Sequence, residues 1–336
     1  MLASVVSSQL AAHRPYGGVV PEIASREHLA NWPRVSGEAL AAAGIRLANV
    51  CDMGDIGVVA ATRGPGLVGA LLVGLSLGKA IAFALERPFH AVHHLEGHLY
   101  SPFLAPPGKK LPADIAPDRF TGLVVSGGHT SLFAVEDGAV ETLGETRDDA
   151  MGEIFDKVGK RLGLPYPQGP QVDELAELGD ATARRFPTPL RDGTLDFSYS
   201  GLKSQALLEI EKLERILGPI DLGATGETGE PVPAPILDLL AGFRAAAVAQ
   251  LVDRLNRLHE RQPLSLLAVS GGVAANRLLR RELPAWADRH GVILRLVPLL
   301  YAGDNAAMIA HAALLRQRRG QSDDPFAAEA ESRIAL

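Results

Sequence analysis

The chain has 336 residues, 47% of them hydrophobic, and a formal net charge of -6. One hydrophobic core rarely grows to this size, so we expect a soluble globular protein with two lobes. The acidic balance argues against binding nucleic acid through a basic surface alone, because counterion release needs clustered Lys and Arg; a local basic groove or a basic partner stays open. The one cysteine, Cys51, excludes an internal disulfide and suits a reducing cytosol.

Two apolar stretches bear on membrane targeting. The opening MLASVVSSQL has no basic region before its short apolar part, so it does not predict a signal peptide. The longest apolar run, LVGALLVGLSLGKAIAFAL, is interrupted by Gly and Ser and contains Lys79, which is costly inside a bilayer. It predicts a buried, glycine-rich helix packed on a sheet, and no membrane span.

Short β-branched runs alternate with helical patterns along the chain. Residues 56–62, 88–94, 120–128 and 264–272 read as buried strands bounded by glycine. Residues 148–164 and 236–261 have helical periodicity. This pattern predicts an α/β fold with ligands near the carboxyl ends of the strands.

Two further features organise the second half of the chain. VVSGG at 124–128 recurs as AVSGG at 268–272, which indicates either two related halves or two edges of one cleft. Residues 217–235 are rich in Gly, Pro and Thr without periodicity, and they predict a flexible loop inserted between two helices.

The stretch GPGLVG at 64–69 fits the G-x-G-x-x-G pattern of dinucleotide-binding folds. That fold also needs an acidic residue at the end of the next strand, to bind a ribose. Glu86 has the right distance along the chain but precedes the 88–94 strand. Close helix packing is therefore the favoured use of these glycines, and a dinucleotide site is the alternative.

VHHLEGHLY at 92–100 raises the question of a metal. If a helix begins where the strand ends, His94 and His98 share one face and both imidazoles can reach one ion. Glu96 points roughly the other way, whereas the H-E-x-x-H peptidase motif places its glutamate directly after the first histidine. Surface or capping histidines are the alternative interpretation. His93 ends the strand and is predicted to be structural.

A third ligand is needed, and Asp304 is a candidate. It stands in Gly303-Asp304-Asn305, which opens an Ala-rich helix. An aspartate in this place is also a natural helix N-cap. Spacing alone does not decide between the two roles.

Several motifs then occur together, in the segments 16–28, 64–80, 93–98, 123–132, 144–167, 197–204, 268–283 and 303–310; among them are HHLEGH, LVVSGGHTSL, FSYSGLKS, AVSGGVAANRLLRREL and GDNAAMIA. The combination resembles the bacterial tRNA threonylcarbamoyladenosine transferases, the Kae1/Gcp-type family, from about Tyr16 to Ala310. The resemblance implies an α/β protein with the two-lobed actin, Hsp70 and sugar-kinase (ASKHA) fold. It places lobe I at 1–115 joined by 300–336, and lobe II at 116–299.

The resemblance also implies the activity, an acyl transfer. A threonylcarbamoyl group passes from threonylcarbamoyl-AMP to the N6 amine of the adenosine 3′ of the anticodon, in tRNAs reading ANN codons, and AMP leaves. One divalent metal per subunit, Fe²⁺ in preference to Zn²⁺, would be held by His94, His98 and Asp304.

Substrate residues follow from the same resemblance. Val124, Val125, Ser126, Gly127 and Gly128 match the family's substrate loop, and glycines at a strand end leave backbone N–H groups open to a phosphate or carboxylate. Asp156 and Gly169 match contacts to the ribose and base, and Asn276 matches a contact to the nucleotide, so the adenylate donor or ATP/ADP would bind there. Read without the resemblance, these three are a helix-surface Asp, a turn Gly and a helix-start Asn. No catalytic residue is assigned beyond the metal ligands, although His129 and Glu145 lie near these loops.

The sequence departs from the family pattern in two places. Gln168 stands where relatives have a glycine, which puts a side chain beside the expected adenosine pocket. Family members also begin with a strand, a loop and a second strand before the segment that matches MLASVVSSQL. The expectation is that the start codon is assigned too late or that this copy is defective, with strand edges left unpaired.

The resemblance implies tRNA as substrate, a paralogous ASKHA subunit and a small P-loop ATPase as partners, and a cytoplasmic location without membrane contact. Two other functions stay open. One is a metal-dependent peptidase, which the position of Glu96 counts against. The other is a non-catalytic ATP-binding scaffold with the ASKHA fold.

Overall fold

The computed structural model describes residues 1–45, 56–105, 117–187, 193–223 and 231–336. The chain divides into two compact units. Unit 1 comprises Met1–Asp118 and Val297–Leu336, and unit 2 comprises Arg119–Leu296. Each unit has its own sheet.

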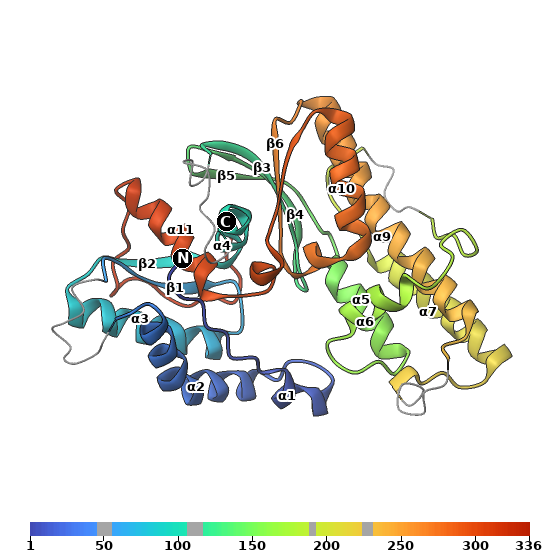
Figure 1. The fold of residues 1–336 in the computed structure, drawn as a ribbon, viewed down its shortest axis with the longest axis horizontal. Helices are drawn as coiled ribbons and strands as arrows, with labels where there is room; N and C mark the ends of the chain where they lie inside the picture. Colours follow the sequence, from blue (N-terminus) through green and yellow to red (C-terminus); the bar gives the residue numbers. More distant parts are fainter. Residues whose placement is uncertain (46–55, 106–116, 188–192, 224–230) are drawn as a thin grey trace. The chain divides into compact units, whose positions relative to one another are not determined.

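Unit 1 is built around two parallel strands, β1 (Val59–Gly64) and β2 (Phe89–His93). Helices α3 (Val68–Leu85) and α11 (Ala306–Arg318) lie on opposite faces of this pair, and α2 (Pro21–Ala42) packs outside α3 (Figure 1). The shorter elements are α1 (Leu10–His13), η1 (Arg14–Tyr16), α4 (His94–Tyr100), η3 (Ser101–Phe103) and η5 (Leu299–Tyr301).

Helix α3 packs on the sheet as expected, but it is not buried all round. Leu75, Gly78 and Ala82 face the strands, and a Cβ at Gly78 would stand 3.1 Å from the Cβ of Ala61. Leu72 and Phe83 lie on the other side and are 48% and 71% exposed. The prediction of a buried helix is therefore wrong for most of its residues: Leu75, Gly78 and Ala82 are the buried ones, because only one face meets the sheet.

Within the residues that the structure describes, two helices, α3 and α9 (Ala234–Arg261), are long and apolar enough to cross a membrane by length and composition. In α9, 67% of the apolar window is buried inside the protein, as in a core helix, whereas in α3 the share is 17%. The glycines of GPGLVG serve packing. A Cβ at Gly64 would meet the carbonyl oxygen of Glu331 at 2.3 Å, and one at Gly69 would meet Oγ of Ser25 at 2.6 Å.

Unit 2 contains a five-stranded sheet in the order β5-β4-β3-β6-β7. Its strands are β3 (Arg119–Val125), β4 (Thr130–Glu136), β5 (Ala139–Glu145), β6 (Leu266–Ser270) and β7 (Ile293–Leu296). Strands β3, β6 and β7 run parallel, and β3, β4 and β5 form an antiparallel meander that the sequence patterns did not reveal.

The helices described in full within unit 2 are α5 (Met151–Arg161), α6 (Gln168–Ala176), α7 (Ser200–Leu217), α9, η4 (Gly272–Ala275) and α10 (Arg277–His290). Helix α9 is its central helix and packs against α6, α7 and α10. The loop predicted at 217–235 falls between α7 and α9, and its residues 224–230 lie outside the described ranges.

A cluster of charged side chains ties the end of α6 to α9 and α10. The buried Arg244 of α9 donates to the carbonyl of Ala176 at 3.1 Å and to the carboxylate of Glu177. Arg281 of α10 donates to both carboxylate oxygens of Glu177, at 2.6 and 2.9 Å. Hydrogen bonds from Arg281 and then Arg244 lower the pKa of Glu177 to about 2 from an ordinary 4.5.

This cluster predicts a defined pH dependence of stability. A carboxylate with a depressed pKa in the folded state stabilises the fold above its unfolded pKa of 4.5, and the contribution is lost as pH falls towards about 2. We expect Glu177→Gln to lower the free energy of unfolding at pH 7 by about 1 to 2 kcal/mol. The difference from wild type should shrink as pH falls through that window. Chemical unfolding followed by circular dichroism measures it. The exposed Glu260→Gln is the control, and a difference that persists unchanged to pH 2 would contradict the assignment.

Candidate functional site

Helix α4 begins at the residue after β2 ends, and this places the histidines. His93 is the N-cap residue of α4, and its Nδ1 accepts a hydrogen bond from the backbone N–H of Leu95 at 3.1 Å. His94 and His98 follow one turn apart on α4, with their ring centroids 4.7 Å from each other. The predicted strand-to-helix junction is therefore present, and the two imidazoles share a face.

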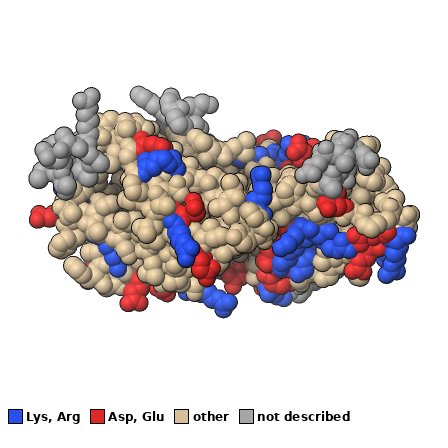
Figure 2. Space-filling view, turned by 90° about the horizontal axis from the view of Figure 1, so that it is seen from below, with Lys and Arg blue, Asp and Glu red and all other residues tan. Residues whose placement is uncertain are grey.

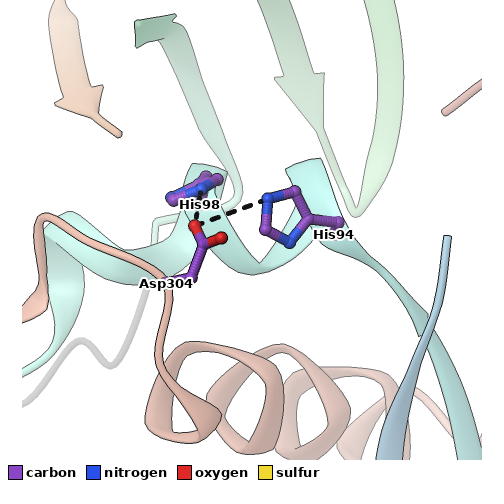
Figure 3. A group of neighbouring side chains, drawn as sticks. All are labelled: His94, His98 and Asp304. Atoms are coloured by element: carbon purple, nitrogen blue, oxygen red, sulfur yellow. Dashed lines mark hydrogen bonds and ion pairs between the residues drawn. The ribbon is translucent and has the colours of Figure 1, made fainter. Parts of the chain in front are cut away.

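Asp304 reaches the same point from a distant part of the chain (Figure 3). Its Oδ1 lies 3.2 Å from Nε2 of His98 and 3.6 Å from Nε2 of His94. The N-cap of α11 is Asn305, whose side chain accepts from the N–H of Met308 at 2.9 Å, so Asp304 does not cap this helix.

A glycine allows the approach between the two helices. A Cβ at Gly97 would stand 2.8 Å from Cδ1 of Ile309 and 3.1 Å from Cγ of Met308, both on α11. A methyl group at Gly97 could be accommodated by rotation of the Ile309 side chain, whereas a longer side chain would press on α11, and the segment holding Asp304 leads directly into α11. A small residue at this position of HLEGH thus supports the close packing of the two helices.

The donor set fits a divalent transition metal. His94, His98 and Asp304 each offer one ligand atom, and these atoms lie within 4.8 Å of one another. Two imidazoles and one carboxylate are the ligands of many zinc and non-haem iron(II) sites that keep open positions. The side chain of His98 is fully buried, whereas that of Asp304 is 76% exposed, so the group is open to solvent on the carboxylate side.

Glu96 does not belong to this group. Burial raises the pKa of its carboxyl, and Arg316 and Arg319 act against that rise. The carboxyl also accepts a hydrogen bond from the backbone of His93. Glu96 therefore faces Arg316 of α11 and Arg319 just after it. Its hydrogen bond with the backbone of His93 stabilises the start of α4.

The expected substrate loop follows β3 in unit 2. Val124 and Val125 are fully buried at the strand end, whereas a Cβ at Gly127 or Gly128 would meet nothing within 4 Å. These two glycines expose their backbone to open space, which suits an anionic ligand. Parallel pairing of β3 with β6 aligns Val124 with Ser270, so VVSGG and AVSGG end on adjacent strands of one sheet.

The start of α5 packs closely against this loop. A Cβ at Gly152 would lie 2.6 Å from the carbonyl oxygen of Ser126 and 2.8 Å from Cα of Gly127. His129, which has no assigned role, is part of the loop turn, since its N–H donates to Oγ of Ser126 at 3.1 Å. Glu145 pairs with Ser131 at the end of β5.

Asp156 and Gly169 are brought together. The N–H of Gly169 donates to Oδ1 of Asp156 at 2.8 Å, and burial raises the pKa of this carboxyl despite that hydrogen bond. The side chain of Gln168 is buried. A Cβ added at Gly159 of α5 would lie only 2.5 Å from the Cβ of Gln168. Gln168 thus packs against α5.

Asn276 is held by a residue that sequence reasoning missed. Its Oδ1 caps α10 by accepting from Leu279 N–H at 3.0 Å, and its Nδ2 donates to Oδ1 of Asp173 at 2.7 Å. The other oxygen of Asp173 accepts from the N–H of Arg277 at 3.0 Å. No local signal in QVDELA distinguishes Asp173 from a surface carboxylate, because its partners lie about a hundred residues away along the chain.

The family model and the curated relatives agree on one family. The family model described as "TsaD: tRNA N6-adenosine threonylcarbamoyltransferase" matches residues 1–311. The tRNA N6-adenosine threonylcarbamoyltransferase of Burkholderia thailandensis is 46% identical over 96% of this chain and 87% of its own length. The protein of that name from a Cyanothece strain is 44% identical over 99% of this chain and 90% of its own. Among solved structures, HypF of T. kodakarensis matches 84% of this chain and 43% of its own with a TM-score of 0.57 at 14% identity, a likeness of fold alone.

The geometry predicts the effect of removing single ligands. We expect His94→Ala, His98→Ala and Asp304→Ala each to abolish stoichiometric metal binding, because two remaining ligands hold a divalent ion weakly against water. Glu96→Gln should retain the metal. Elemental analysis of anaerobically purified protein measures metal content. Metal lost from Glu96→Gln and kept by Asp304→Ala would contradict the ligand set.

Proposed function

The chain belongs to the tRNA N6-adenosine threonylcarbamoyltransferase family, and we propose that His94, His98 and Asp304 form its metal centre. The chain has the ASKHA fold. It transfers the threonylcarbamoyl group of threonylcarbamoyl-AMP to N6 of the adenosine 3′ of the anticodon, in tRNAs reading ANN codons. The metal proposal rests on three ligand atoms that lie within 4.8 Å of one another. Two belong to His94 and His98 of α4, and the third belongs to Asp304, two residues before the start of α11.

The reaction is an acyl transfer with AMP as leaving group. The amine nitrogen attacks the carbamoyl carbon, and a C–N bond forms as the bond from that carbon to a phosphate oxygen breaks. AMP departs with the electron pair and the amine loses one proton. The protein must therefore hold an adenylate and stabilise negative charge at the reacting carbonyl and phosphate.

The ligand chemistry favours Fe²⁺, with Zn²⁺ as the alternative. A set of two histidines and one carboxylate with open positions is typical of non-haem iron(II), and catalytic zinc sites use similar sets. A divalent ion bound there supplies a Lewis acid that can polarise a carbonyl or hold donor oxygens. The exposure of Asp304 supports access of a substrate to such an ion.

The nucleotide part of the donor, or ATP or ADP, is proposed to bind in unit 2. The open backbone at Gly127 and Gly128, next to the start of α5, supports binding of a phosphate. Asp156 is proposed to contact the ribose, at the point where it holds Gly169. Asn276 is proposed to contribute to the same site from the start of α10, fixed by Asp173.

The substrate is tRNA, and we propose that two partner proteins assist, a paralogous ASKHA subunit and a small P-loop ATPase, in the cytoplasm. Where Lys and Arg gather on the face in Figure 2, Asp and Glu lie beside them, which supports weak tRNA binding by the chain alone. The exposed apolar residues of α3, among them Leu72 and Phe83, support a protein partner.

The other two functions are weaker. A metal-dependent peptidase needs a general base beside the ion, and Glu96 instead faces Arg316 and Arg319. A non-catalytic scaffold would retain nucleotide binding without transfer. The deciding experiment supplies threonylcarbamoyl-AMP, unmodified tRNA and the partner proteins, and measures modified adenosine in a single turnover.

A substitution in the substrate loop separates ligand binding from folding. A side chain at Gly127 would meet open space, so Gly127→Val should leave the melting temperature nearly unchanged. The same substitution should weaken binding of the adenylate by ~100-fold or more, because the branched side chain occupies the place of the phosphate. Calorimetric titration with a non-hydrolysable adenylate analogue measures this. Leu208→Val, on the exposed side of α7, is the control, and wild-type affinity in Gly127→Val would exclude the loop as the site.

A further inference from the structure

His93 connects the metal-binding helix to the C-terminal part of the chain. Its Nδ1 accepts from Leu95 N–H at 3.1 Å, so this nitrogen carries no proton. Nε2 therefore carries the proton and donates to the carbonyl of Ile334, 3.2 Å away. The carboxyl of Glu96 also accepts a hydrogen bond from the backbone of His93, so both side chains stabilise the start of the helix.

Residues 323–334 form a strap across the sheet of unit 1. At its beginning, the N–H of Asp323 donates to the carbonyl of Phe89 at 2.9 Å. The Asp323 carboxylate accepts from Ala91 N–H at 2.9 Å, and Arg316 donates to the Ala91 carbonyl at 3.1 Å. These contacts satisfy the open edge of β2 as a neighbouring strand would.

The middle of the strap is anchored in the core. Ala328 is buried in the apolar cluster between α3 and the sheet, and its carbonyl accepts a hydrogen bond from Lys79. Glu331 N–H donates to the carbonyl of Arg63 at 2.8 Å, at the end of β1. The strap then reaches Ile334, and the C-terminus lies beside α4 (Figure 1).

We propose that His93 is a positioning residue for the metal centre and that the strap fixes its orientation through the Ile334 carbonyl. This inference rests on the proposed metal centre. The first turn of a helix has no backbone acceptors for its own N–H groups, so it depends on its cap. His94 stands in that first turn, whereas His98 is a turn further on and is held by the contact of Gly97 with α11. Loss of the cap therefore displaces His94 first.

The test measures metal binding directly. Metal-free protein is titrated with Co²⁺ against a chromogenic chelator, and the visible absorption of the bound Co²⁺ is recorded. We expect His93→Ala to weaken Co²⁺ binding ~10-fold and to change the absorption band. His93→Asn should restore affinity to within about twofold, because the asparagine side chain is a preferred N-cap.

Two truncations test the strap. Removing residues 334–336 deletes the Ile334 carbonyl but keeps the contacts of Glu331, and it should weaken Co²⁺ binding about as much as His93→Ala. Removing only 335–336 keeps that carbonyl and should have no effect. His93→Ala combined with the longer truncation should be no worse than either change alone, because both act on the same cap.

Each other outcome counts against a defined part of the proposal. Wild-type Co²⁺ affinity and spectrum in His93→Ala would overturn it, as would multiplicative losses in the combined variant, which would show that the strap acts without His93. Circular dichroism and melting curves verify that every variant is folded. If Asp304→Ala binds Co²⁺ as tightly as wild type, the metal centre itself is wrong and the inference falls with it. If Asp304→Ala abolishes binding while His93→Ala does not change it, only the role of His93 is wrong.

Discussion

The close packing of α4 against α11 at Gly97 brings together the two parts of the candidate metal site in unit 1. One helix carries both imidazoles and the other begins two residues after the carboxylate. Interhelical distance therefore sets the distance from the imidazole nitrogens to Oδ1 of Asp304. A Cβ at Gly97 would lie 2.8 Å from Cδ1 of Ile309, which can rotate away, whereas a longer side chain would reach the backbone of α11 and separate the helices. Metal ligand distances tolerate deviations of about 0.2 Å, so even a small separation is disruptive.

Unit 2 depends on an equivalent close approach between backbones. Gly271 has φ of +91°, and a Cβ there would lie 2.2 Å from the carbonyl oxygen of Val125. The chain can therefore turn away from β6 directly beside the end of β3. Gly152 brings the start of α5 against the same loop. Glycines at these places let three backbone segments meet around residues 126–128, because a Cβ at Gly152 or Gly271 would clash with a backbone carbonyl oxygen.

The sequence predicted the parts of the site whose signals are local. The strand-to-helix junction at His93 and His94 follows from a β-branched run and helical spacing, and the strand ends at Val125 and Ser270 follow from their glycines. Contacts between distant segments had no such signal. Residue patterns alone did not bring Asp304 to His98, or Asp173 to Asn276, because each pair is separated by more than a hundred residues. The resemblance to a family supplied the first pair and not the second.

One expectation failed because a local pattern does not report what covers a surface, and one alternative left open by the sequence is excluded. The composition of α3 matches a buried helix, yet α2 covers only part of its outer face and leaves Leu72 and Phe83 exposed. Asp304 matches an N-cap by sequence, yet Asn305 takes that position. A shift of one residue at a helix start is within the usual uncertainty of such boundaries, and here it changes the role of a charged group.

That one-residue shift points to a common arrangement at the helix starts of the site. Backbone N–H groups at a helix N-terminus attract any nearby oxygen or unprotonated nitrogen, so a ligand residue placed there can be taken up as the cap. In this protein a neighbour takes that position: His93 caps α4 beside His94, and Asn305 caps α11 beside Asp304. The cap at α11 is neutral, which leaves the Asp304 carboxylate and its charge for the imidazoles or for a cation. Replacing Asn305 with a residue that cannot cap would therefore let Asp304 compete for the Met308 N–H. The Asp304 carboxylate would then leave the two imidazoles, while the helix would keep a cap.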